Sequence, residues 1–542
     1  MFYISGKKIH KKLIRETKKS DKIAYIKPDD LKTDLTNGKD YIMPKSKNKK
    51  RTVLFLFISF ALAAGVIFSA GCGGETPAEG AADKTGDLPE IQATEEPPSH
   101  YAAGYLPEVS YGGYEFRVMT PKNGSFDHLI SLEADVEEET GETLPDAIYK
   151  RNRLIEERYG IVFKGLVTAS YDACFDQFKK AVRSASDDFD LCMLLPRYAW
   201  AQAIEGGAAV VADLPHLDIS QPWYVKSVNS EMTIDGKMFF AYSDECLNLL
   251  ENTSCVLFNK QLTADLGLGN MYALVKEGKW TIDVFFAYAR TAAADLDGDG
   301  KMTENDRYGI LSTASEFVPA FWSSAGVRTV EKDANDLHVF AGQNQKYYDI
   351  LDKVCENLYG GEKIYFDGAF DKVRDSAIPF SENYGLFYSH CLRAVPGLRA
   401  METDFGILPF PKYDEAQPLY YSRAGRGWIN TAPVSATDLA RTSVIMEALA
   451  VESKNYVIPA YFEVALRTKF LRDDDSEEML NIIEQNRFVD LGDTIYATPI
   501  SDMITNSIIG DKNTNFVSLI EKNLGTIEDI IQKSNEAAQA LG

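Results

Sequence analysis

The segment between residues 111 and 195 alternates between strand-like and helix-like patterns, and this alternation restricts the fold more than any other feature. Strands alternate polar and apolar residues or form short apolar runs, whereas amphipathic helices repeat apolar residues every three or four positions. These patterns predict strands at 115–119, 161–164 and 189–195 and helices at 144–159 and 171–184. This order implies parallel strands joined by crossover helices, so we expect an α/β lobe.

The rest of the chain repeats this theme less regularly. The whole chain has 542 residues, a length that suggests more than one lobe. Thr281 is the expected N-cap of a helix, because its hydroxyl can accept a hydrogen bond from a backbone N–H of the first turn. Strands are predicted at 253–258 and 405–411, and amphipathic helices at 436–450 and 515–541. Gly525 is expected to interrupt the last helix.

An uncharged apolar run follows a basic flank and ends two positions before Cys72. Small residues occupy the three positions before this cysteine, a pattern typical of a lipoprotein signal peptide whose cysteine is lipidated. We therefore expect residues 1–71 to be an N-terminal extension and signal peptide, with Met43 as an alternative start. Residues 72–107, rich in Gly, Ala, Glu and Pro, are expected to be a disordered tether. The protein would then be lipid-anchored on the extracytoplasmic face of the cell membrane; the alternative is an N-terminal anchor helix.

Charge and cysteine usage exclude several classes of function. The chain has a formal net charge of −23 although its first 51 residues are basic, so the remainder is strongly acidic and nucleic acid is not expected as a partner. Most of the cysteines after Cys72 are single residues within apolar stretches, which predicts small buried side chains. Cys246 and Cys255 form the only close pair, and no C-x-x-C motif indicates a zinc or redox site.

An aspartate-rich loop follows the pattern D-x-D-x-D-G with an acidic residue at position twelve. Hard cations such as Ca²⁺ prefer several oxygen ligands, which such a loop supplies. The predicted ligands are the side chains of Asp295, Asp297, Asp299 and Asp306 and the backbone carbonyl of Lys301. The residues that follow favour a strand and not a helix, so we expect a structural calcium site and not a signalling EF-hand.

Five sequence elements occur in order along the chain. They are Cys72; 190–195 with 209–214; 236–242 with 256–260; 278–281 with the aspartate-rich loop; and 404–411 with 427–430. In this order they resemble family 1 of the extracellular solute-binding proteins, the carbohydrate-binding components of ABC importers. The resemblance implies a type II periplasmic-binding-protein-like fold, in which two α/β lobes close on a ligand by a hinge motion.

The resemblance also implies where the lobes divide. Chain crossings are expected near residues 246–255, 406–411 and 455–461. The first α/β lobe would contain residues 108–250 and 411–455, and the second α/β lobe, with the calcium loop, residues 251–410 and 456–542.

Aligned segments place candidate ligand contacts on both sides of the implied cleft. The first lobe contributes Arg197, Tyr198, Tyr242, Asp244, Glu245, Arg423, Arg426 and Trp428. The second lobe contributes Glu316, Phe321, Trp322, Tyr384, Phe387 and Tyr388. Aromatic faces pack against the C–H groups of pyranose rings, whereas carboxylates and guanidiniums bind hydroxyls. Trp200 and Trp280 are instead predicted to be packing residues.

The resemblance implies a monomer that captures a carbohydrate, expected to be an oligosaccharide, and delivers it to ABC permease subunits without chemistry of its own. The sequence agrees, since it contains no G-x-S-x-G, H-E-x-x-H or P-loop motif. A surface glycoside hydrolase is an alternative, because such enzymes need only two suitably placed carboxylates. A glycan sensor or adhesin of the same fold, working without a transporter, is a second alternative.

Overall fold

The computed structural model describes residues 100–121, 138–360, 363–367, 377–398, 400–467, 474–508, 512 and 514–541. The predicted signal peptide, Cys72 and residues 72–99 of the predicted tether lie outside the described residues. Within the described ranges, no helix is long and apolar enough to cross a membrane.

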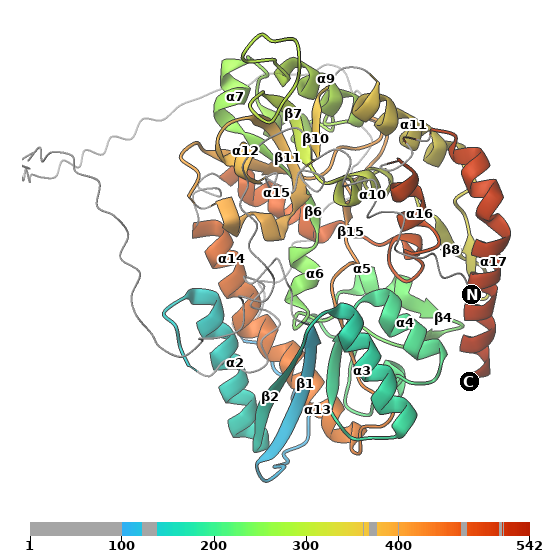
Figure 1. Cartoon of the computed structure of the whole chain (residues 1–542). Helices are drawn as coiled ribbons and strands as arrows, with labels where there is room; N and C mark the ends of the chain where they lie inside the picture. Colours follow the sequence, from blue (N-terminus) through green and yellow to red (C-terminus); the bar gives the residue numbers. More distant parts are fainter. Residues whose placement is uncertain are drawn as a thin grey trace, which may run out of the picture. The chain divides into compact units, whose positions relative to one another are not determined.

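A four-stranded sheet forms the centre of the first lobe (Figure 1). Its order is β14-β3-β1-β2, with β1 at Tyr114–Pro121, β2 at Ile161–Thr168, β3 at Leu191–Leu194 and β14 at Ile429–Thr431. Strand β1 runs parallel to both β2 and β3, whereas β14 is antiparallel to β3. The parallel strands joined by crossover helices that the alternating pattern predicts are therefore present.

A local sequence signal marks one end of each connecting helix. α2 (Thr143–Tyr159) ends at Gly160, whose φ of 60° is the left-handed conformation that glycine adopts easily. α3 (Tyr171–Ser184) begins after Ser170, whose side chain accepts a hydrogen bond from a backbone N–H of the first turn. α4 (Pro196–Ile204) follows β3 and starts with proline, which the first helical position tolerates. The lobe also contains η3 (Val211–Asp213), α5 (Lys226–Asn229), η4 (Ser230–Met232), β4 (Thr233–Ile234), β5 (Lys237–Met238) and α13 (Leu439–Glu452).

A five-stranded sheet with the order β10-β7-β11-β6-β12 forms the centre of the second lobe. The strands are β6 (Ser254–Asn259), β7 (Tyr308–Ser312), β10 (Tyr365–Asp367), β11 (Gly385–Cys391) and β12 (Phe405–Leu408). β7 is parallel to β10 and β11, whereas β6 is antiparallel to β11 and β12. The helices of this lobe are α7 (Lys260–Asp265), α8 (Met271–Lys276), α9 (Ile282–Ala292), α10 (Ala314–Ser324), α11 (Gln345–Tyr359), α12 (Ala377–Ser381), η5 (Leu392–Ala394), η6 (Pro396–Leu398), α14 (Ile458–Arg467), α15 (Asp474–Gln485) and α16 (Ser501–Asn506). Thr281 caps α9 as predicted, since its hydroxyl accepts a hydrogen bond from a backbone N–H of the first turn.

Buried apolar side chains form two large clusters. The first core surrounds the sheet of the first lobe and includes Phe116 of β1, and the second core surrounds the sheet of the second lobe and includes Leu257 of β6. The chain passes between them at α6 (Leu247–Glu251), where Leu249 belongs to the first core and Leu250 to the second. It passes again where α13 continues through a π-helical turn (Ser453–Val457) into α14 (Figure 1). Both passages lie near positions expected from the sequence.

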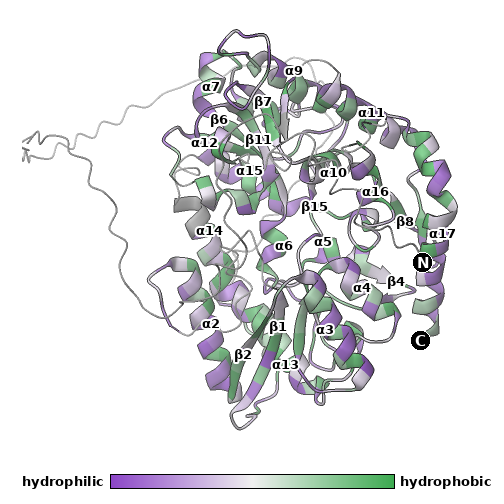
Figure 2. Cartoon of the chain, viewed as in Figure 1, coloured by the Kyte–Doolittle hydropathy of each residue, from purple (hydrophilic) through white to green (hydrophobic). Residues whose placement is uncertain are grey.

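We expected the C-terminal helix to belong to the second lobe alone, but it packs in both cores. α17 (Phe516–Ala540) runs without a break through Gly525, and Figure 2 shows hydrophobic and hydrophilic stretches side by side along it. Its buried apolar residues join the second core first and the first core later, at Phe516 and Ile520 and then at Ile527 and Ile531. A glycine costs a helix only about 1 kcal/mol, which burial on both sides of it outweighs here.

A second departure concerns the crossing expected at 406–411. Phe410 and Tyr420 still belong to the second core, and Ala424 is the next residue in the first core. Between them, β13 (Ser422–Arg423) pairs in parallel with β15 (Arg487–Phe488). Because of this pairing, residues after β15, including Leu491 of η8 (Leu491–Asp493), pack in the first core. The predicted assignment of residues 456–542 to the second lobe is therefore wrong for this segment. A small hairpin of β8 (Val330–Lys332) and β9 (His338–Phe340) also joins the first core through Val330.

The end of the predicted tether is ordered. Ala103 and Leu106 are buried in the first core, and the backbone N–H of Tyr101 donates to Asn455 Oδ1 at 2.8 Å. Asn455 Nδ2 returns a 3.0 Å hydrogen bond to the Tyr101 carbonyl. Residues 100–107 therefore belong to the folded body, because two of their apolar side chains pack in the first core, which composition alone does not reveal.

The six cysteines that the structure describes are buried free thiols, as their apolar sequence context predicts. Cys246 and Cys255, the close pair in sequence, are not bonded. Cys174 on α3 and Cys192 on β3 come nearest in space, with 3.5 Å between their sulfur atoms.

Candidate functional site

A cavity of about 290 Å³ is lined by segments of both lobes. Its charged walls contain the guanidiniums of Arg197, Arg393 and Arg426 and the carboxylates of Glu316 and Asp493. Its remaining functional groups are the aromatic rings of Tyr171 and Trp428 and the amide of Asn252. This combination of aromatic faces and charged hydrogen-bonding groups suits a polar ligand with an apolar face.

The topology explains why these side chains meet. Arg197 lies in the first turn of α4, directly after β3, and Glu316 lies in the first turn of α10, soon after β7. Arg393 lies in η5, which follows β11. In α/β proteins ligands bind beyond the carboxyl ends of the strands, and these three residues all follow such ends.

Trp428 and Tyr171 form the aromatic part of the wall. Their ring centroids are 5.4 Å apart with 57° between the planes. Trp428 packs with Met193, and Tyr171 and Leu195 pack against this small cluster, which is separate from the two large cores. The backbone N–H of Trp428 donates to Asn248 Oδ1 at 2.5 Å, which holds the tryptophan in place from the first residues of α6.

An ion-pair network lies behind one side of the cavity. Arg423, only 3% exposed, donates from Nε to Asp493 Oδ2 at 2.5 Å and from Nη1 to Glu316 Oε2 at 3.1 Å. Arg426 pairs with Asp493 at 3.0 Å, and Arg393 pairs with Glu316 at 3.3 Å. Each carboxylate is therefore held by two guanidiniums, and Arg423 connects the two carboxylates.

These contacts fix the ionisation of both acids. Burial opposes the charged form of Glu316, but the guanidiniums of Arg423 and Arg393 outweigh this effect and lower its pKa to about 2. Burial likewise opposes ionisation of Asp493, and Arg423 and Arg426 again lower the pKa below its ordinary value. Both side chains are therefore carboxylates at neutral pH and act as acceptors only.

The structure brings four of the sequence-predicted contacts to the cavity wall and places a fifth behind it. The four are Arg197, Glu316, Arg426 and Trp428. The fifth is Arg423, which supports the wall through its ion pairs.

Three predicted aromatic contacts are packing residues of the second core. Phe321, Trp322 and Phe387 are all fully buried, and none lines the cavity. Trp322 donates from Nε1 to Asp490 Oδ2 at 3.1 Å and packs edge-on against Tyr347. Their positions follow from the apolar faces of α10 and β11, which turn toward the core. Trp200 and Trp280, predicted as packing residues, are buried in the first and second cores respectively.

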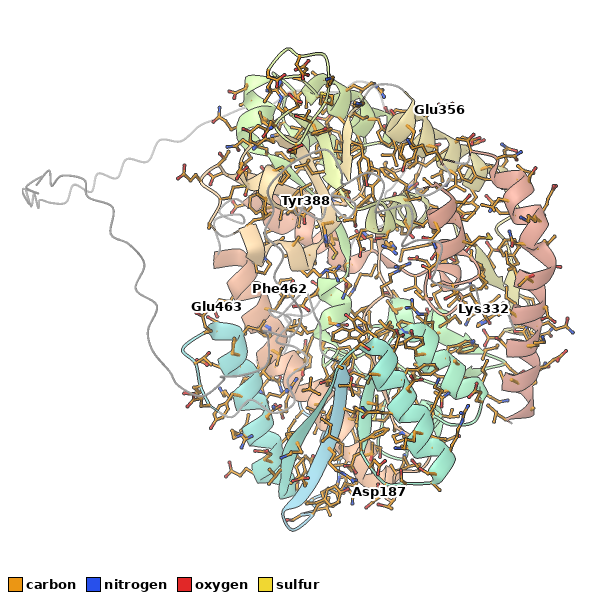
Figure 3. The ribbon with its side chains drawn as sticks, viewed as in Figure 1. Asp187, Lys332, Glu356, Tyr388, Phe462 and Glu463 are labelled. Carbon is orange, nitrogen blue, oxygen red and sulfur yellow. The ribbon has the colours of Figure 1, made fainter. Side chains whose placement is uncertain are left out.

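Tyr242 and Tyr388 are also buried away from the cavity. Tyr242 is fully buried, and its hydroxyl donates to the Gly427 carbonyl at 2.6 Å. It therefore supports the segment that carries Trp428 without reaching the cavity itself. Tyr388 lies on β11 in the second lobe (Figure 3). It is 3% exposed and packs against Phe380.

The other predicted contacts lie near the passages between lobes or on the surface, and none is a wall residue. Asp244 pairs with Lys454 at 3.2 Å, and burial raises its pKa despite that cation. Glu245 is buried and accepts a hydrogen bond from Asn430 Nδ2. The remaining two are Tyr198, which donates to Asp172, and Tyr384, whose backbone N–H donates to the Pro379 carbonyl at 2.8 Å.

Sequence reasoning missed Tyr171, Asn252, Arg393 and Asp493. Tyr171 and Arg393 could have been found from their positions directly after a turn or a strand end, where binding residues gather. Asn252 and Asp493 carry no such local pattern. Asp493 in particular comes from a segment that only the pairing of β13 with β15 brings to the site.

The aspartate-rich loop forms a second candidate site. One carboxylate oxygen from each of Asp295, Asp297 and Asp299 lies within 4.8 Å of the others, and all three side chains are exposed. The backbone N–H groups of Gly298 and Gly300 donate to the two oxygens of Asp295, each at 2.7 Å, which folds the loop around this residue. This set of hard oxygen donors fits a cation such as Ca²⁺.

Asp306 does not join the other predicted side-chain ligands. Asp306 is not part of the carboxylate cluster, although it is buried. It accepts hydrogen bonds from the backbone N–H groups of Leu296 at 2.8 Å and Thr303 at 2.7 Å, and these bonds lower its pKa. It therefore closes the loop as a hydrogen-bond acceptor. The backbone N–H of Lys301 donates to Asp299 Oδ1 at 2.8 Å, and the role of its carbonyl as a ligand stays a prediction.

Solved structures of solute-binding proteins share this fold. UgpB from Mycobacterium tuberculosis, in complex with glycerophosphocholine, aligns with a TM-score of 0.53 at 16% identity, covering 78% of this chain and 99% of that one. The sugar-binding protein MalE from Xanthomonas citri aligns with a TM-score of 0.52 at 14% identity, covering 77% and 98%. An ABC transporter solute-binding protein from Thermotoga lettingae, bound with α-D-tagatose, aligns with a TM-score of 0.50 at 13% identity, covering 79% and 100%.

These likenesses confirm the predicted fold class, a two-lobed α/β fold of the periplasmic-binding-protein type. One of these proteins is a solute-binding protein of an ABC transporter, and another is a sugar-binding protein. No family model matches the sequence, and no curated protein matches it either. At such identities the comparison establishes the fold, while membership of family 1 stays a prediction.

Proposed function

We propose that this protein is an extracytoplasmic solute-binding protein that captures a carbohydrate between its lobes and delivers it to an ABC permease. The observation that carries the proposal is the cavity, where Tyr171 and Trp428 stand beside charged groups from both lobes. Sugar rings place C–H faces on aromatic side chains, and their hydroxyls bind carboxylates and guanidiniums. The fold shared with a solute-binding protein of an ABC transporter and with a sugar-binding protein supports the same function.

The cavity size bears on the length of the ligand. Its volume of about 290 Å³ lies at the small end of ligand sites, which span about 300–1,000 Å³. One or two sugar rings fill such a space. We therefore propose that an oligosaccharide binds with one end in the cavity. We also propose that the protein works as a monomer, as the resemblance to solute-binding proteins implies.

The ionisation of the cavity disfavours the glycoside hydrolase alternative at this position. A hydrolase of this kind needs one carboxyl group with a raised pKa that donates a proton to the leaving oxygen. Glu316 and Asp493 both have lowered pKa values, because each carboxylate binds two guanidiniums. Neither residue holds a proton at neutral pH, so we expect binding without turnover.

A thermal-shift screen of neutral and acidic glycans tests the carbohydrate proposal. A ligand at a hundredfold excess over Kd stabilises the native state by about 2.7 kcal/mol, which raises the melting temperature measurably. Trp428→Ala should reduce that shift, while Leu419→Ala, at an exposed apolar residue outside the cavity wall, should not. The sugar assignment fails if no glycan raises the melting temperature. The alternative enzyme is supported instead if chromatography of the incubated glycan shows cleavage products.

We also propose that the aspartate-rich loop binds Ca²⁺ as a structural ion. The strand β7 follows the loop, so the helix that a signalling EF-hand requires is replaced by a sheet element. Addition of Ca²⁺ after chelation should raise the melting temperature of the wild type. Asp297→Asn should weaken that response, whereas Asp265→Asn, at an exposed aspartate outside the cluster, should keep it. An identical melting temperature with Ca²⁺ and with chelator contradicts the proposal.

Lipid anchoring at Cys72 is the third part of the proposal, supported by the sequence pattern before this cysteine. In the producing cell, the wild type should partition into the membrane fraction and incorporate labelled fatty acid. Cys72→Ala should abolish the label. If the variant keeps its membrane association without label, an uncleaved N-terminal helix is the anchor.

A further inference from the structure

The cavity wall contains more positively charged side chains than negatively charged ones. The wall contains three guanidiniums, from Arg197, Arg393 and Arg426, but only two carboxylates. Both carboxylates already bind two guanidiniums each, as described above. A ligand therefore meets acids whose charge is compensated and at least one cation whose charge is not. This local excess of guanidiniums contrasts with the net charge of −23 for the whole chain.

Arg197 is the cation without a carboxylate partner. Among the described residues no acidic side chain lies within ion-pair distance of it, and its guanidinium carbon stands 5.0 Å from the centre of the Tyr198 ring. The side chain is half-buried at the cavity wall. A guanidinium has five N–H donors and no acceptor, and it pairs in a fork with planar anionic oxygen groups.

One further feature at the same wall favours negative charge. Arg197 lies in the first turn of α4, whose N-cap residue Leu195 provides no side-chain hydrogen bond, so the positive end of the helix is not compensated there.

We propose that the ligand is an acidic saccharide, whose anionic oxygen group binds Arg197 near the start of α4 while a sugar ring packs against Trp428. This inference rests on the proposed function and adds the charge of the ligand to it. The anionic group is a carboxylate, as in a hexuronic acid, or a phosphate or sulfate ester, since all three present oxygens that a guanidinium fork can bind.

The test compares matched saccharides by isothermal titration calorimetry on the full mature chain with Ca²⁺ present. Oligosaccharides of glucuronic and galacturonic acid are measured beside neutral oligosaccharides of glucose and galactose, and beside phosphorylated and sulfated sugars. We expect one acidic series to bind at least tenfold more tightly than its neutral counterpart. The best series identifies the anionic group. Raising the salt concentration should weaken the acidic ligand more than the neutral one.

Substitutions then assign the preference to Arg197. Arg197→Met should lower affinity for the acidic ligand about 10- to 100-fold, the range for a lost hydrogen bond to a charged group, and leave the neutral ligand within about threefold. Arg197→Lys keeps the charge without the fork and should lose less. Arg183→Met removes an exposed arginine of the same lobe and should change neither affinity. The melting temperatures of all variants report whether they fold.

The outcomes separate this inference from the proposed function. Equal affinity for acidic and neutral sugars, unchanged in Arg197→Met, overturns the acidic ligand but leaves carbohydrate binding intact. Binding of inorganic phosphate or sulfate as tight as that of any acidic sugar overturns both, because the sugar ring then contributes nothing. No binding of any saccharide also rejects both. Preference for an acidic sugar that Arg197→Met abolishes supports both.

Discussion

Replacing Arg423 by methionine tests whether the ion-pair network holds the two lobes' segments together. The guanidinium is 3% exposed and bridges Asp493 of η8 and Glu316 of α10, at 2.5 Å and 3.1 Å. Methionine keeps most of the side-chain volume and removes the charge. Both carboxylates then remain in place with one guanidinium each, Arg426 and Arg393 respectively. Removal of one partner from a buried ion pair costs about 3–5 kcal/mol, because the other partner stays desolvated.

The pKa of Glu316 gives an independent estimate of part of this cost. Its pKa falls from an ordinary 4.5 to about 2 in the folded protein. A shift of this size corresponds to roughly 3 kcal/mol of folding free energy. Since the folded-state pKa is lowered, this stabilisation is present above pH 4.5 and is lost as the pH falls toward 2. Asp493, whose pKa is also lowered, adds to the same dependence.

Chemical denaturation followed by tryptophan fluorescence and far-UV circular dichroism measures the effect. At pH 7, Arg423→Met should unfold at a clearly lower denaturant concentration than the wild type. The gap should narrow as the pH falls below 4.5, because the wild type loses a stabilisation that the variant has already partly lost. Arg183→Met, at an exposed position, should stay within about 0.5 kcal/mol of the wild type. A small effect at pH 7, or a gap that does not change with pH, refutes the reasoning.

Three further predictions address the packing of the two cores. Tyr242→Phe should destabilise the protein by about 1–2 kcal/mol in thermal or chemical unfolding, because the Gly427 carbonyl loses its 2.6 Å hydrogen bond. Ile531→Ala should lower the free energy of unfolding by about 2–4 kcal/mol, because Ile531 of α17 packs in the first core. Val517→Ala, at an exposed position of the same helix, should lower it far less, and equal effects contradict this packing. A thiol reagent should react with none of the six described cysteines in the native protein. After denaturation without reductant it should react with all six, and reaction with only four of them would indicate a disulfide.

Local signals made much of the secondary structure predictable. Gly160 ends α2 and Thr281 starts α9, because both act within a single turn of the chain. The parallel pairing of β1 with β2 and β3 follows from the alternation of strands and helices. The length and continuity of α17 were not predictable from Gly525, because burial against two cores overrides a local preference.

Some residues of the candidate site could likewise be predicted from the sequence, and others could not. Arg197, Glu316, Arg426 and Trp428 could be nominated from segments that resemble a known family, and all four line the cavity. Trp322 sits in an equally apolar segment, yet it packs against Tyr347 in the second core. Sequence spacing alone does not tell a tryptophan that faces a cavity from one that faces a core, since both lie on apolar faces of their elements.

The sequence by itself determined which segments become strands and helices, the α/β class, and the aspartate pattern of the loop, because these depend on neighbours a few residues apart. Only the tertiary structure decided which charges meet. Arg423 reaches Asp493 across 70 residues of chain and Glu316 across 107. Of the three wall arginines, Arg197 is the one without a carboxylate partner among the described residues. The charge that a ligand encounters is therefore set by packing between distant segments, which no local pattern records.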